Sequence, residues 1–518
     1  MFPATQLPLS VSWPTNHVLL VIAAISLTYC FVHVIYNLFL SPLSAIPGPW
    51  YYAISDFWMI THVIRLRQCK AVQSLFEQYG PVVRIGPNKV VFRDLSTMRN
   101  VYSVYKFDKS TYYKSLLTND NDHAMTTLDH ANHAIRRKSY AQHYTPSNVA
   151  QFQPEMQEFT FQLIHSLEKL CGKSPVECLA LFRHLMVDVV VSSLFGYRLG
   201  AVGRWTMDVE DPLSTAINDF PKRGILRSVV PKWAWKLVCR IPSNRWRKMC
   251  DSDKILAEAS LIFFVSGRVY EMRAQMNAGK IGDSEKLPML QRLLGYCYSP
   301  TEQMPDHDVI SECIGHCMAG TDTTSTTISY LFWELSRRPD IMKKLQAELD
   351  DAIPDSKSLP DIAVLQELPY LNAFMKEGLR VYTAVPSLLE RVVPVSSSKH
   401  GSSNEIFDMM GYALPPGTIV ATQAWSMHRD PSVFPSPNSF VPERWLESPY
   451  TTSEDFSKMA AHMMPFGTGT RLAVAAFVRN FDISAPEDTN TSSMDIKDSF
   501  VIFPAGFECK LVFTPRQQ

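Results

Sequence analysis

No cysteine lies between Cys317 and Cys509 in this chain of 518 residues, and no two cysteines form a C-x-x-C pair. The ten cysteines are scattered, which excludes a compact disulfide framework and predicts reduced, mostly buried thiols in a cytosolic body. Net charge is also lacking, because 50 basic residues balance 50 acidic ones. A field of one sign that would attract nucleic acid is therefore excluded, and we expect no nucleic-acid partner.

Charged side chains are missing from residues 17–40. As a helix this segment would be about 36 Å long, enough to cross a lipid bilayer. A cleaved signal peptide is the alternative, but its apolar core would be shorter and would follow a basic segment, whereas residues 1–16 carry no charge. We therefore predict an N-terminal tail over 1–16 and a retained transmembrane anchor over 17–40. Arg65, Arg67 and Lys70 follow the anchor and favour a cytosolic body.

Proline and glycine mark the segment that follows the anchor. Ser41-Pro42 and Pro47-Gly48-Pro49 predict a stiff, extended connector over 41–50, because proline fixes φ and disfavours helix in the residue before it. Further on, the apolar runs 82–85 and 90–92 flank a Gly-Pro-Asn-Lys turn and predict a β-hairpin.

The remaining chain, 51–518, is predicted to form one α+β domain that is predominantly α-helical. A helical pattern occupies most of 95–345, and strand patterns become frequent after residue 381. Three further features are predicted: a loop-like break around 279–306, a loop rich in Ser and Gly over 396–404, and a final hairpin over 500–513 around Pro504.

The segment 317–324 (CMAGTDTT) lies in a helical stretch from His307 to Arg338. Its Ala-Gly pair lets a bulky ligand approach the helix backbone closely, and a glycine inside a helix, which costs about 1 kcal/mol, needs such a reason. Asp322 and Thr323 are able to relay protons to that ligand. The alternative is a threonine-rich face that hydrogen-bonds the carbonyls of its own helix.

Two further motifs bring charges of opposite sign together. Glu377 and Arg380 stand three residues apart on a predicted helix and can therefore pair, although most such pairs are solvated surface charges. The run 440–445 (FVPERW) presents Arg444 from a proline-fixed turn, and an arginine fork suits a carboxylate. An ordinary loop with a surface ion pair is the alternative for this run.

Taken in order, these features resemble the cytochrome P450 superfamily from the anchor to the C-terminus. The ordered motifs are an apolar anchor with Pro-Gly-Pro, then A-G-x-D-T-T, E-x-x-R, F-x-P-E-R-W, and F-G-x-G-x-R at 466–471. Segments 36–49, 425–431 and 503–508 resemble fungal microsomal members in particular. The resemblance implies the P450 fold behind a transmembrane helix, a haem cofactor, and a monooxygenase that inserts oxygen from O2 into a lipophilic small molecule.

The resemblance also implies roles for single residues. Asp322 and Thr323 match the acid and alcohol that deliver protons during oxygen activation. Glu377, Arg380 and Arg444 match a buried triad that holds the haem-side loop in place, which is a structural role.

Four other residues match positions that bind the haem propionates in the family. Arg391 follows the E-x-x-R helix, and Arg471 belongs to the haem loop itself. His133 and Arg137 stand where the family often has W-x-x-x-R, so a histidine replaces the tryptophan. A solvated basic helix face is the alternative for this last pair.

The haem loop departs from the family pattern F-x-x-G-x-R-x-C-x-G. It continues as Leu472-Ala473-Val474-Ala475, so Ala473 stands at the position of the ligand cysteine and cannot bind iron. The helix that the cysteine normally opens would end near Phe481-Asp482, and the nine residues from 472 to 480 are too few for it. The sequence therefore predicts a deletion around 471–481, not a point substitution, and leaves no metal ligand.

His462, Met463 and Met464 lie just upstream and are chemically able to bind haem iron. The loop would have to fold back on itself, and neither residue type supplies the electron push of a thiolate. Three hypotheses stay open: a monooxygenase whose given sequence is damaged, for example by a mis-assigned intron, a non-catalytic P450-like membrane protein, and a decayed gene product that does not fold. For the chain as given we predict no haem thiolate and no activity.

The resemblance implies a setting as well. An active member would be a single-pass protein of the endoplasmic reticulum membrane with a cytosolic catalytic domain. It would receive electrons from an NADPH–cytochrome P450 reductase, and it would act in fungal secondary metabolism. Substrate contacts are expected in 110–128, 211–240, 386–390 and 503–507, where apolar and small residues suit a lipophilic ligand without specifying it.

Overall fold

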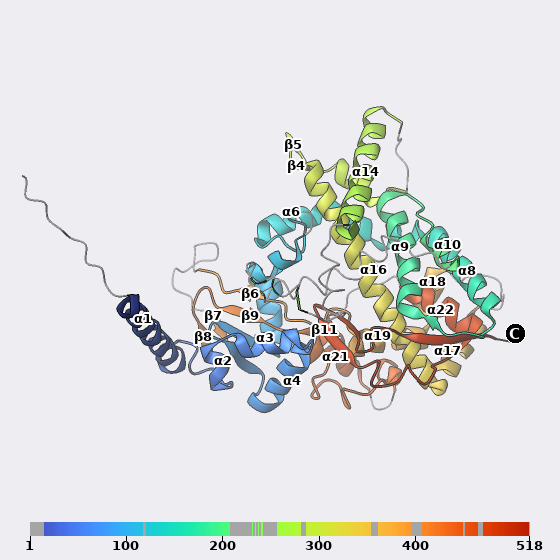
Figure 1. The fold of residues 1–518 in the computed structure, drawn as a ribbon. Coiled ribbons are helices and arrows are strands. Elements are labelled where there is room, and N and C mark those ends of the chain that lie inside the picture. Colours follow the sequence, from blue (N-terminus) through green and yellow to red (C-terminus); the bar gives the residue numbers. More distant parts are fainter. Residues whose placement is uncertain are drawn as a thin grey trace, which may run out of the picture.

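Helices dominate the computed structural model of the chain, and short sheets lie at its edges (Figure 1). This arrangement confirms the predicted α+β class with mostly helical content. The structure describes residues 15–117, 121–207, 256–280, 286–353, 361–395, 407–448, 451–464 and 470–516, together with positions 230, 234, 237, 240 and 241.

The helices of the first half lead from the anchor to the region before the long central helix. They are α1 (Thr15–Ile35), η1 (Tyr36–Leu40), α2 (Trp50–Ile54), α3 (Phe57–Ile64), α4 (Gln68–Tyr79), α5 (Leu95–Arg99), η2 (Asn100–Val104), η3 (Thr111–Leu116), α6 (His130–Tyr140), η4 (Ala141–Tyr144), α7 (Pro146–Ala150), α8 (Gln153–Leu170), α9 (Cys178–Phe195), α10 (Ala201–Thr206), α14 (Leu256–Asn277) and α15 (Met289–Leu294).

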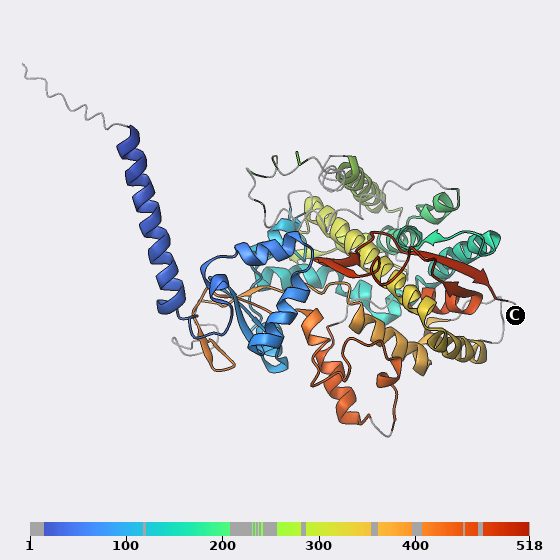
Figure 2. The same cartoon turned by 60° about the horizontal axis from the view of Figure 1, so that its bottom comes forward.

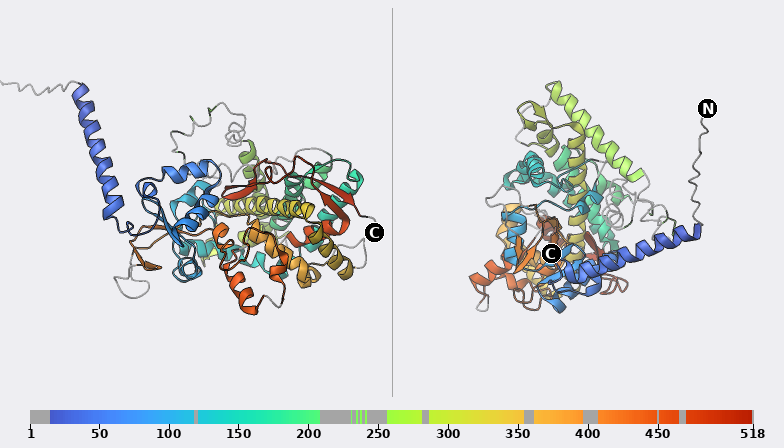
Figure 3. Two further views of the ribbon diagram at one scale, coloured as in Figure 1. Left: turned by 90° about the horizontal axis from the view of Figure 1, so that it is seen from below. Right: turned by 90° about the vertical axis from the view of Figure 1, so that its left-hand side faces the viewer.

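The helices of the second half surround the predicted site residues. They are α16 (Asp306–Arg337), α17 (Pro339–Ala352), α18 (Ile362–Glu367), α19 (Pro369–Val381), α20 (Ala424–Met427), η5 (Pro442–Trp445), α21 (Ser453–His462) and α22 (Thr470–Asn480). α16 covers the predicted stretch from His307 to Arg338 and runs through the middle of the body (Figure 3).

In the described part of the chain, five small sheets complete the fold. Their strands are β1 (Val82–Gly86), β2 (Lys89–Phe92), β3 (Val176–Glu177), β4 (Cys297–Ser299), β5 (Glu302–Gln303), β6 (Arg391–Val392), β7 (Phe407–Met409), β8 (Tyr412–Leu414), β9 (Ile419–Ala421), β10 (Phe481–Ser484), β11 (Ile496–Ser499), β12 (Val501–Pro504) and β13 (Lys510–Pro515). The largest sheet has the order β1-β2-β9-β6, so the predicted β1–β2 hairpin is confirmed at its edge. The predicted break around 279–306 contains α15 and the β4–β5 pair, and the predicted loop over 396–404 lies outside the described residues.

α1 forms an apolar rod that stands apart from the body (Figure 2), and η1 joins it to the body, where Arg84 donates to Asn37 O at 2.8 Å. Among the described residues, two segments are long and apolar enough to cross a membrane, namely His17–Leu40 and Cys178–Phe195. The most apolar 18 residues of the first have no share buried inside the molecule, whereas 72% of the second is buried, as expected of a core helix. The exposed rod is compatible with the predicted anchor.

The segment after the anchor differs from the extended connector that its prolines predicted. Residues 41–46 form turns, in which Ser44 N donates to Ser41 O at 2.9 Å and Ile46 N donates to Leu43 O at 3.2 Å. Leu43 and Ile46 are buried in a small core with residues of β1 and β2. Proline restricts φ, but burial of these two apolar side chains folds the segment back onto the body.

The predicted final hairpin over 500–513 is wrong. β12 pairs with β11 across a tight connection at Phe500, which adopts a φ of 65°. β13 instead pairs with β10 and β3. The turn after Pro504 exists, and Phe507 N donates to Pro504 O at 2.9 Å, but this turn leads from one sheet to another. Local alternation predicted the strands, whereas partners elsewhere in the chain decided their pairing.

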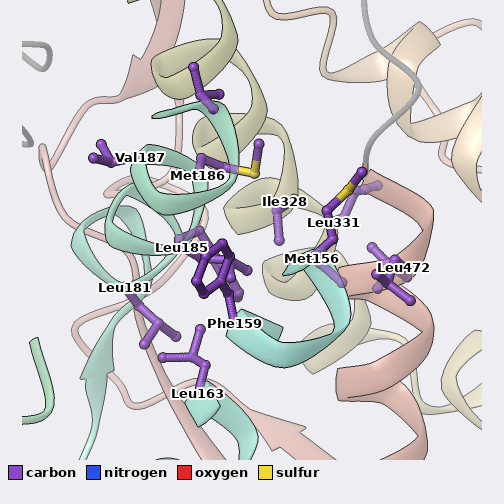
Figure 4. Packing of buried hydrophobic residues seen from close by; sticks show 14 of the residues in the cluster. Met156, Phe159, Leu163, Leu181, Leu185, Met186, Val187, Ile328, Leu331 and Leu472 are labelled. Atoms are coloured by element: carbon purple, nitrogen blue, oxygen red, sulfur yellow. The ribbon is translucent and has the colours of Figure 1, made fainter. Parts of the chain in front are cut away.

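The main hydrophobic core gathers around α8, α9, α16 and α22 (Figure 4). Met156 and Phe159 of α8 meet Leu185 of α9, Leu331 of α16 and Leu472 of α22 in this core. Every residue of α22 from 472 to 479 is buried. The short helix is therefore an integral part of the core.

We expect Gly378→Ala to destabilise the protein, because a Cβ on Gly378 would lie 2.2 Å from Leu331 Cδ2 in the α16–α19 contact. Overpacking of this kind costs about 1–3 kcal/mol. Denaturant unfolding measures the loss. The matched control is Gly267→Ala in α14, where no heavy atom lies within 4 Å of the new Cβ, so stability should be unchanged or raised by up to about 1 kcal/mol. An equal effect of both substitutions would contradict the packing argument.

Candidate active site

Glu377 and Arg380 form a fully buried ion pair within α19. Arg380 Nε donates to Glu377 Oε2 and Arg380 Nη2 to Glu377 Oε1, both at 2.8 Å, and neither side chain has any exposed surface. The spacing of three residues places both groups on one helix face. This geometry differs from the solvated surface pair that the motif alone would favour.

The motif 440–445 delivers three further donors to the same carboxylate. Arg444 Nε lies 3.1 Å from Glu377 Oε1, the Val441 amide lies 2.9 Å from the same oxygen, and the Trp445 indole Nε1 lies 2.9 Å from Oε2. Burial lowers the pKa of Arg444, and Glu377 opposes that shift. The structure thus brings together Glu377, Arg380 and Arg444, and Trp445 joins them.

Arg380 also fixes the segment that follows α20. Its Nη1 donates to the carbonyls of His428 at 2.9 Å and Pro437 at 2.6 Å, and its Nη2 donates to that of Ser439 at 2.9 Å. All these donors belong to one buried guanidinium, so the position of α19 determines the course of residues 428–439.

His428 connects the carbonyls bound by Arg380 to Met464, the residue just before the predicted haem loop. Met464 N donates to His428 Nε2 at 2.8 Å, so the ring proton is on Nδ1, which lies 3.3 Å from Arg380 O. Burial, followed by repulsion from Arg429, lowers the pKa of His428 to about 3. The loop entrance is therefore held by a neutral, buried imidazole, while residues 465–469 lie outside the described part of the chain.

Asp322 and Thr323 lie in the middle of α16. Thr323 Oγ1 donates to Ala319 O at 2.7 Å, and Thr327 Oγ1 donates to Thr323 O at 2.8 Å. These are the helix back-bonds that the alternative interpretation of the motif describes. Ala319 is exposed in spite of its place in the central helix, and Gly320 approaches Val190 of α9 so closely that a Cβ would lie 3.0 Å away.

Asp322 is buried and borders a hollow of about 240 Å³. Thr326 of α16, Phe503 of β12 and Phe507 of the turn after β12 also line this hollow. The two phenylalanine rings are in contact at a tilt of 36°, with centroids 5.1 Å apart. The predicted substrate turn over 503–507 therefore lies beside the predicted acid.

Arg391 lies against two tyrosines near the start of β6. Its guanidinium is 4.9 Å from the Tyr102 ring centroid and 5.7 Å from that of Tyr113, and Nη1 donates to the Tyr113 hydroxyl at 3.2 Å. Lys109 forms an antiparallel bridge with Arg391, and its Nζ is 5.7 Å from the Tyr113 centroid. Burial, followed by repulsion from Arg391, lowers the pKa of Lys109 to about 7. Two cations thus share one aromatic neighbour.

The charge of this cationic group also acts on His133. Burial, followed by repulsion from Lys109, lowers the pKa of His133 to about 4. Arg137 lies on the same helix, α6, and is exposed. Its neighbour Arg136 instead reaches α16, where it pairs with Asp308 at 2.7 Å and Glu312 at 3.1 Å. The basic face of α6 is therefore divided between solvent, the central helix and the Arg391 group.

Arg471 lies in the first turn of α22, away from the Arg391 group. Its Nε donates to Asn372 Oδ1 of α19 at 2.8 Å, and burial lowers its pKa. Ala473 follows inside the same helix, where only 5% of its surface is exposed. The residue predicted to stand at the position of the ligand cysteine is thus part of a packed helix.

Sequence reasoning missed Lys109, Arg136, His428 and Trp445. Trp445 closes the F-x-P-E-R-W motif, so its donor was within reach of a pattern argument. His428 and its neighbour Arg429 were noted only as part of segment 425–431, which resembles fungal members of the family. Lys109 and Arg136 gave no signal, because their partners lie on distant elements.

The predicted substrate segments are only partly described. Most of 211–240 lies outside the described residues. Leu388 is buried and forms a bridge with Gln423, while Glu390 pairs with Lys89 and accepts from Ser110 Oγ at 2.6 Å. Segment 386–390 is therefore fixed by its own contacts on several sides.

The described residues do not fit a haem thiolate. Cys317 is the cysteine nearest to Asp322 in sequence, and burial raises the pKa of its thiol to about 12. The Arg391 group suits carboxylates such as the propionates of haem, but no thiolate faces it from the described part of the chain.

Comparison with known proteins identifies the family to which this chain belongs. The cytochrome P450 family model matches residues 47–511. This chain belongs to the cytochrome P450 family, and membership implies haem binding, a small-molecule substrate and a redox partner reductase as general family properties.

Several fungal proteins are similar along most of their length. The cytochrome P450 monooxygenase cypX of Dothistroma septosporum is 26% identical over 511 residues, covering 94% of each chain. The cytochrome P450 monooxygenase stcB of Emericella nidulans is 26% identical and covers 92% of this chain and 89% of its own. The N-acetyltryptophan 6-hydroxylase ivoC of the same organism is 27% identical, with 90% and 88% covered.

Glu377→Gln should destabilise the protein by about 3–5 kcal/mol, because it leaves two buried guanidinium groups without their carboxylate. Denaturant unfolding measures this loss. Glu158→Gln is the matched control, since Glu158 pairs with Arg198 on the surface, and it should cost no more than about 1 kcal/mol. A small effect at Glu377 would mean that the buried cluster does not support the fold.

The neutral, buried state of His428 predicts how the free energy of unfolding falls at acid pH. Its pKa is about 3 in the folded protein and about 6.5 in an unfolded chain, so only the unfolded state takes up the proton between these values. Stability is therefore present above about pH 6.5 and falls as the pH drops toward 3, by up to about 1.4 kcal/mol per pH unit. Unfolding measured against pH should show a shallower limb for His428→Gln. An unchanged slope would contradict the neutral, buried state of this ring.

Proposed function

We propose that this chain carries the scaffold of a fungal microsomal monooxygenase for lipophilic small molecules and that, as given, it does not perform haem-thiolate chemistry. The observation that carries the proposal is the position of Ala473, which is buried inside α22 and packed in the main core. No cysteine occurs from residue 318 to residue 508. The thiolate is the ligand that promotes O–O cleavage in this family.

The packing of α22 supports the loss of a segment over a point substitution. α22 is described from Thr470, after residues 465–469, which lie outside the described part of the chain, and its apolar residues already fill the core. A substituted cysteine would have left a loop at position 473, followed by a longer helix. The proposed deletion therefore lies between Thr470 or Arg471 on one side and Leu472 on the other.

The neighbouring residues do not supply another ligand. Met463 packs beside Phe434, Trp445 and Met459 in a small core, and the Met464 amide is bound to His428. His462 is buried at the end of α21, where its Nδ1 lies 2.7 Å from Lys458 O. Moving these side chains to haem iron would disrupt the contacts that hold the loop entrance.

The other site residues keep the roles that their positions support. Asp322 and Thr323 are proposed as the proton-relay pair of the active relatives. Glu377, Arg380 and Arg444 are proposed as the structural triad. His133, Arg137 and Arg391 are proposed for the haem propionates, and Arg471, which contacts Asn372, is the weakest of that group.

The organisation and setting follow the same proposal. Residues 17–40 anchor the chain in the endoplasmic reticulum membrane, 41–50 connect, and 51–518 form the cytosolic catalytic-type domain. An NADPH–cytochrome P450 reductase would be the electron donor of an intact copy, and fungal secondary metabolism its pathway class.

A second candidate is a non-catalytic P450-like membrane protein that binds lipophilic ligands. The burial of α22 favours it over a product that does not fold, because the shortened helix still closes the core. Saturable binding of lipophilic probes by the full chain, without turnover when reductase and NADPH are added, would support this candidate.

We expect the chain as given to lack the carbon monoxide absorbance band of a reduced haem thiolate, because no thiolate can reach the iron. Difference spectroscopy on the purified full-length protein supplied with haem measures the band. The control is an intact fungal relative expressed in the same way, which should show it. A thiolate-type band from this chain would refute the proposal.

The transcript across codons 465–482 tests whether the sequence is damaged. Additional residues that include a cysteine would assign the gene to an active monooxygenase and restrict the proposal to this form of the chain. A transcript that matches the given sequence would leave the non-catalytic protein as the gene product.

A further inference from the structure

An exposed aromatic surface lies on α2 and α3, directly after the predicted anchor (Figure 1). Its large exposed side chains are Trp50 at 66%, Phe57 at 59%, Trp58 at 46% and Ile64 at 43%. Tyr51 joins them, because its ring centroid lies 5.8 Å from that of Trp50 and 5.1 Å from that of Trp58. A contiguous apolar surface of this kind marks a contact with a partner molecule or a membrane.

α3 is apolar on its outer side as well as on its inner side. Met59 and Val63 are buried in two small cores and attach the helix to the body. Phe57 and Trp58 stay exposed, with ring centroids 5.7 Å apart, and α3 contains no Asp, Glu, Lys or Arg. The outer face of a surface helix in a soluble protein is polar, whereas a helix that lies in a membrane interface presents an apolar face with aromatic residues.

Exposed arginines follow this aromatic surface at the end of α3. Arg65 and Arg67 are both exposed. Asp56 is the one acidic residue in the sequence from 50 to 67, and its carboxylate lies against Gly86 in the β1–β2 turn. The end of α3 therefore has an excess of positive charge, which complements the anionic headgroups of a lipid bilayer.

A buried arginine fixes the base of the anchor next to the aromatic surface. Arg84 of β1 donates from Nη1 to Asn37 O at 2.8 Å and from Nη2 to Asn37 Oδ1 at 3.2 Å. The same guanidinium donates to the carbonyls of Gly86 at 3.2 Å and Pro87 at 2.7 Å. Arg84 and Asn37 are both buried. These bonds tie η1 to the sheet, so the position of the anchor relative to α2 and α3 is fixed by contacts.

We propose that the aromatic surface of α2 and α3 binds the anionic face of the same lipid bilayer that takes up the anchor. This inference rests on the anchor of the proposed function and adds a second contact, which lies in the membrane interface. Tryptophan and tyrosine suit that position, because an apolar ring carries a donor that reaches the headgroups. Contact through α1 and α3 together fixes the rotation of the body about the anchor, which a single helix leaves free.

The test is photocrosslinking of the full-length chain in vesicles of phosphatidylcholine and phosphatidylserine. Phe57→p-benzoylphenylalanine is the test variant, and the same substitution at Phe31 of α1 reports on the anchor itself. The matched control is Phe161, which is 52% exposed on α8, at the end of the body far from α1 (Figure 1). We expect lipid adducts at positions 31 and 57, with a yield at 57 about fivefold or more above that at 161. Mass spectrometry of the irradiated protein measures the yields.

The three positions separate the second contact from the anchor. Lipid adducts at 31 without adducts at 57 overturn the contact and leave the anchor in place. Equal yields at 57 and 161, or crosslinks from 57 to a second copy of the chain, also overturn the contact. Adducts at 57 without adducts at 31 contradict the anchor and support the aromatic surface. The absence of adducts at both positions overturns both proposals.

The two exposed arginines allow an independent measurement. Arg65→Gln combined with Arg67→Gln should lower the lipid yield at position 57 about twofold or more, because it removes the charge that phosphatidylserine attracts. Arg198→Gln, which breaks a surface pair with Glu158, should leave the yield unchanged. The yield at position 31 should stay the same in both cases. A yield at 57 that does not respond to the loss of both arginines would overturn the assignment to an anionic membrane surface.

Discussion

The carboxylate of Glu377 is the interaction on which the rest of the C-terminal half depends. It accepts hydrogen bonds from Arg380, Val441, Arg444 and Trp445 in a site without exposed surface. Removing water from such a charge is costly unless every lone pair is satisfied, and here four groups from two elements satisfy it. Because Arg380 also binds three carbonyls, one buried charge determines the path of the chain from residue 428 to residue 445.

This network of hydrogen bonds ends just before the segment in which the haem loop of the family is predicted. The contacts of Glu377, Arg380 and His428 lead to Met464, and α22 starts again at Thr470 with a buried apolar face. Contacts therefore fix the chain up to Met464 and again from Leu472, and no cysteine occurs from residue 318 to residue 508. A protein can keep the surroundings of a site while it lacks the site itself, since these surroundings are maintained by packing and hydrogen bonds that do not involve the cofactor.

Short-range patterns predicted more than long-range contacts. The spacing of Glu377 and Arg380 and the fork of Arg444 gave the buried cluster its members, because the residues that interact are close in sequence or belong to one motif. The final hairpin was wrong because β13 finds its partners in β10 and β3, which alternation within one segment cannot reveal. Lys109 was missed for the same reason, since only the bridge to Arg391 places it in the candidate site. The turns at 41–46 show burial overriding the stiffness of proline.

The attachment of α22 at its two ends is unequal. At its C-terminal end the helix passes directly into β10, which pairs with β13, and Asn480 O accepts from the Arg516 amide at 3.0 Å. At its N-terminal end, within the described part of the chain, the side chain of Arg471 bonds to the amide side chain of Asn372. Residues added before Thr470 would therefore extend the helix outward from a fixed base, and the buried face from Leu472 to Val478 would keep its rotation. The junction at 470 is a permissive insertion point, at which the length of the chain can change while the core stays in register.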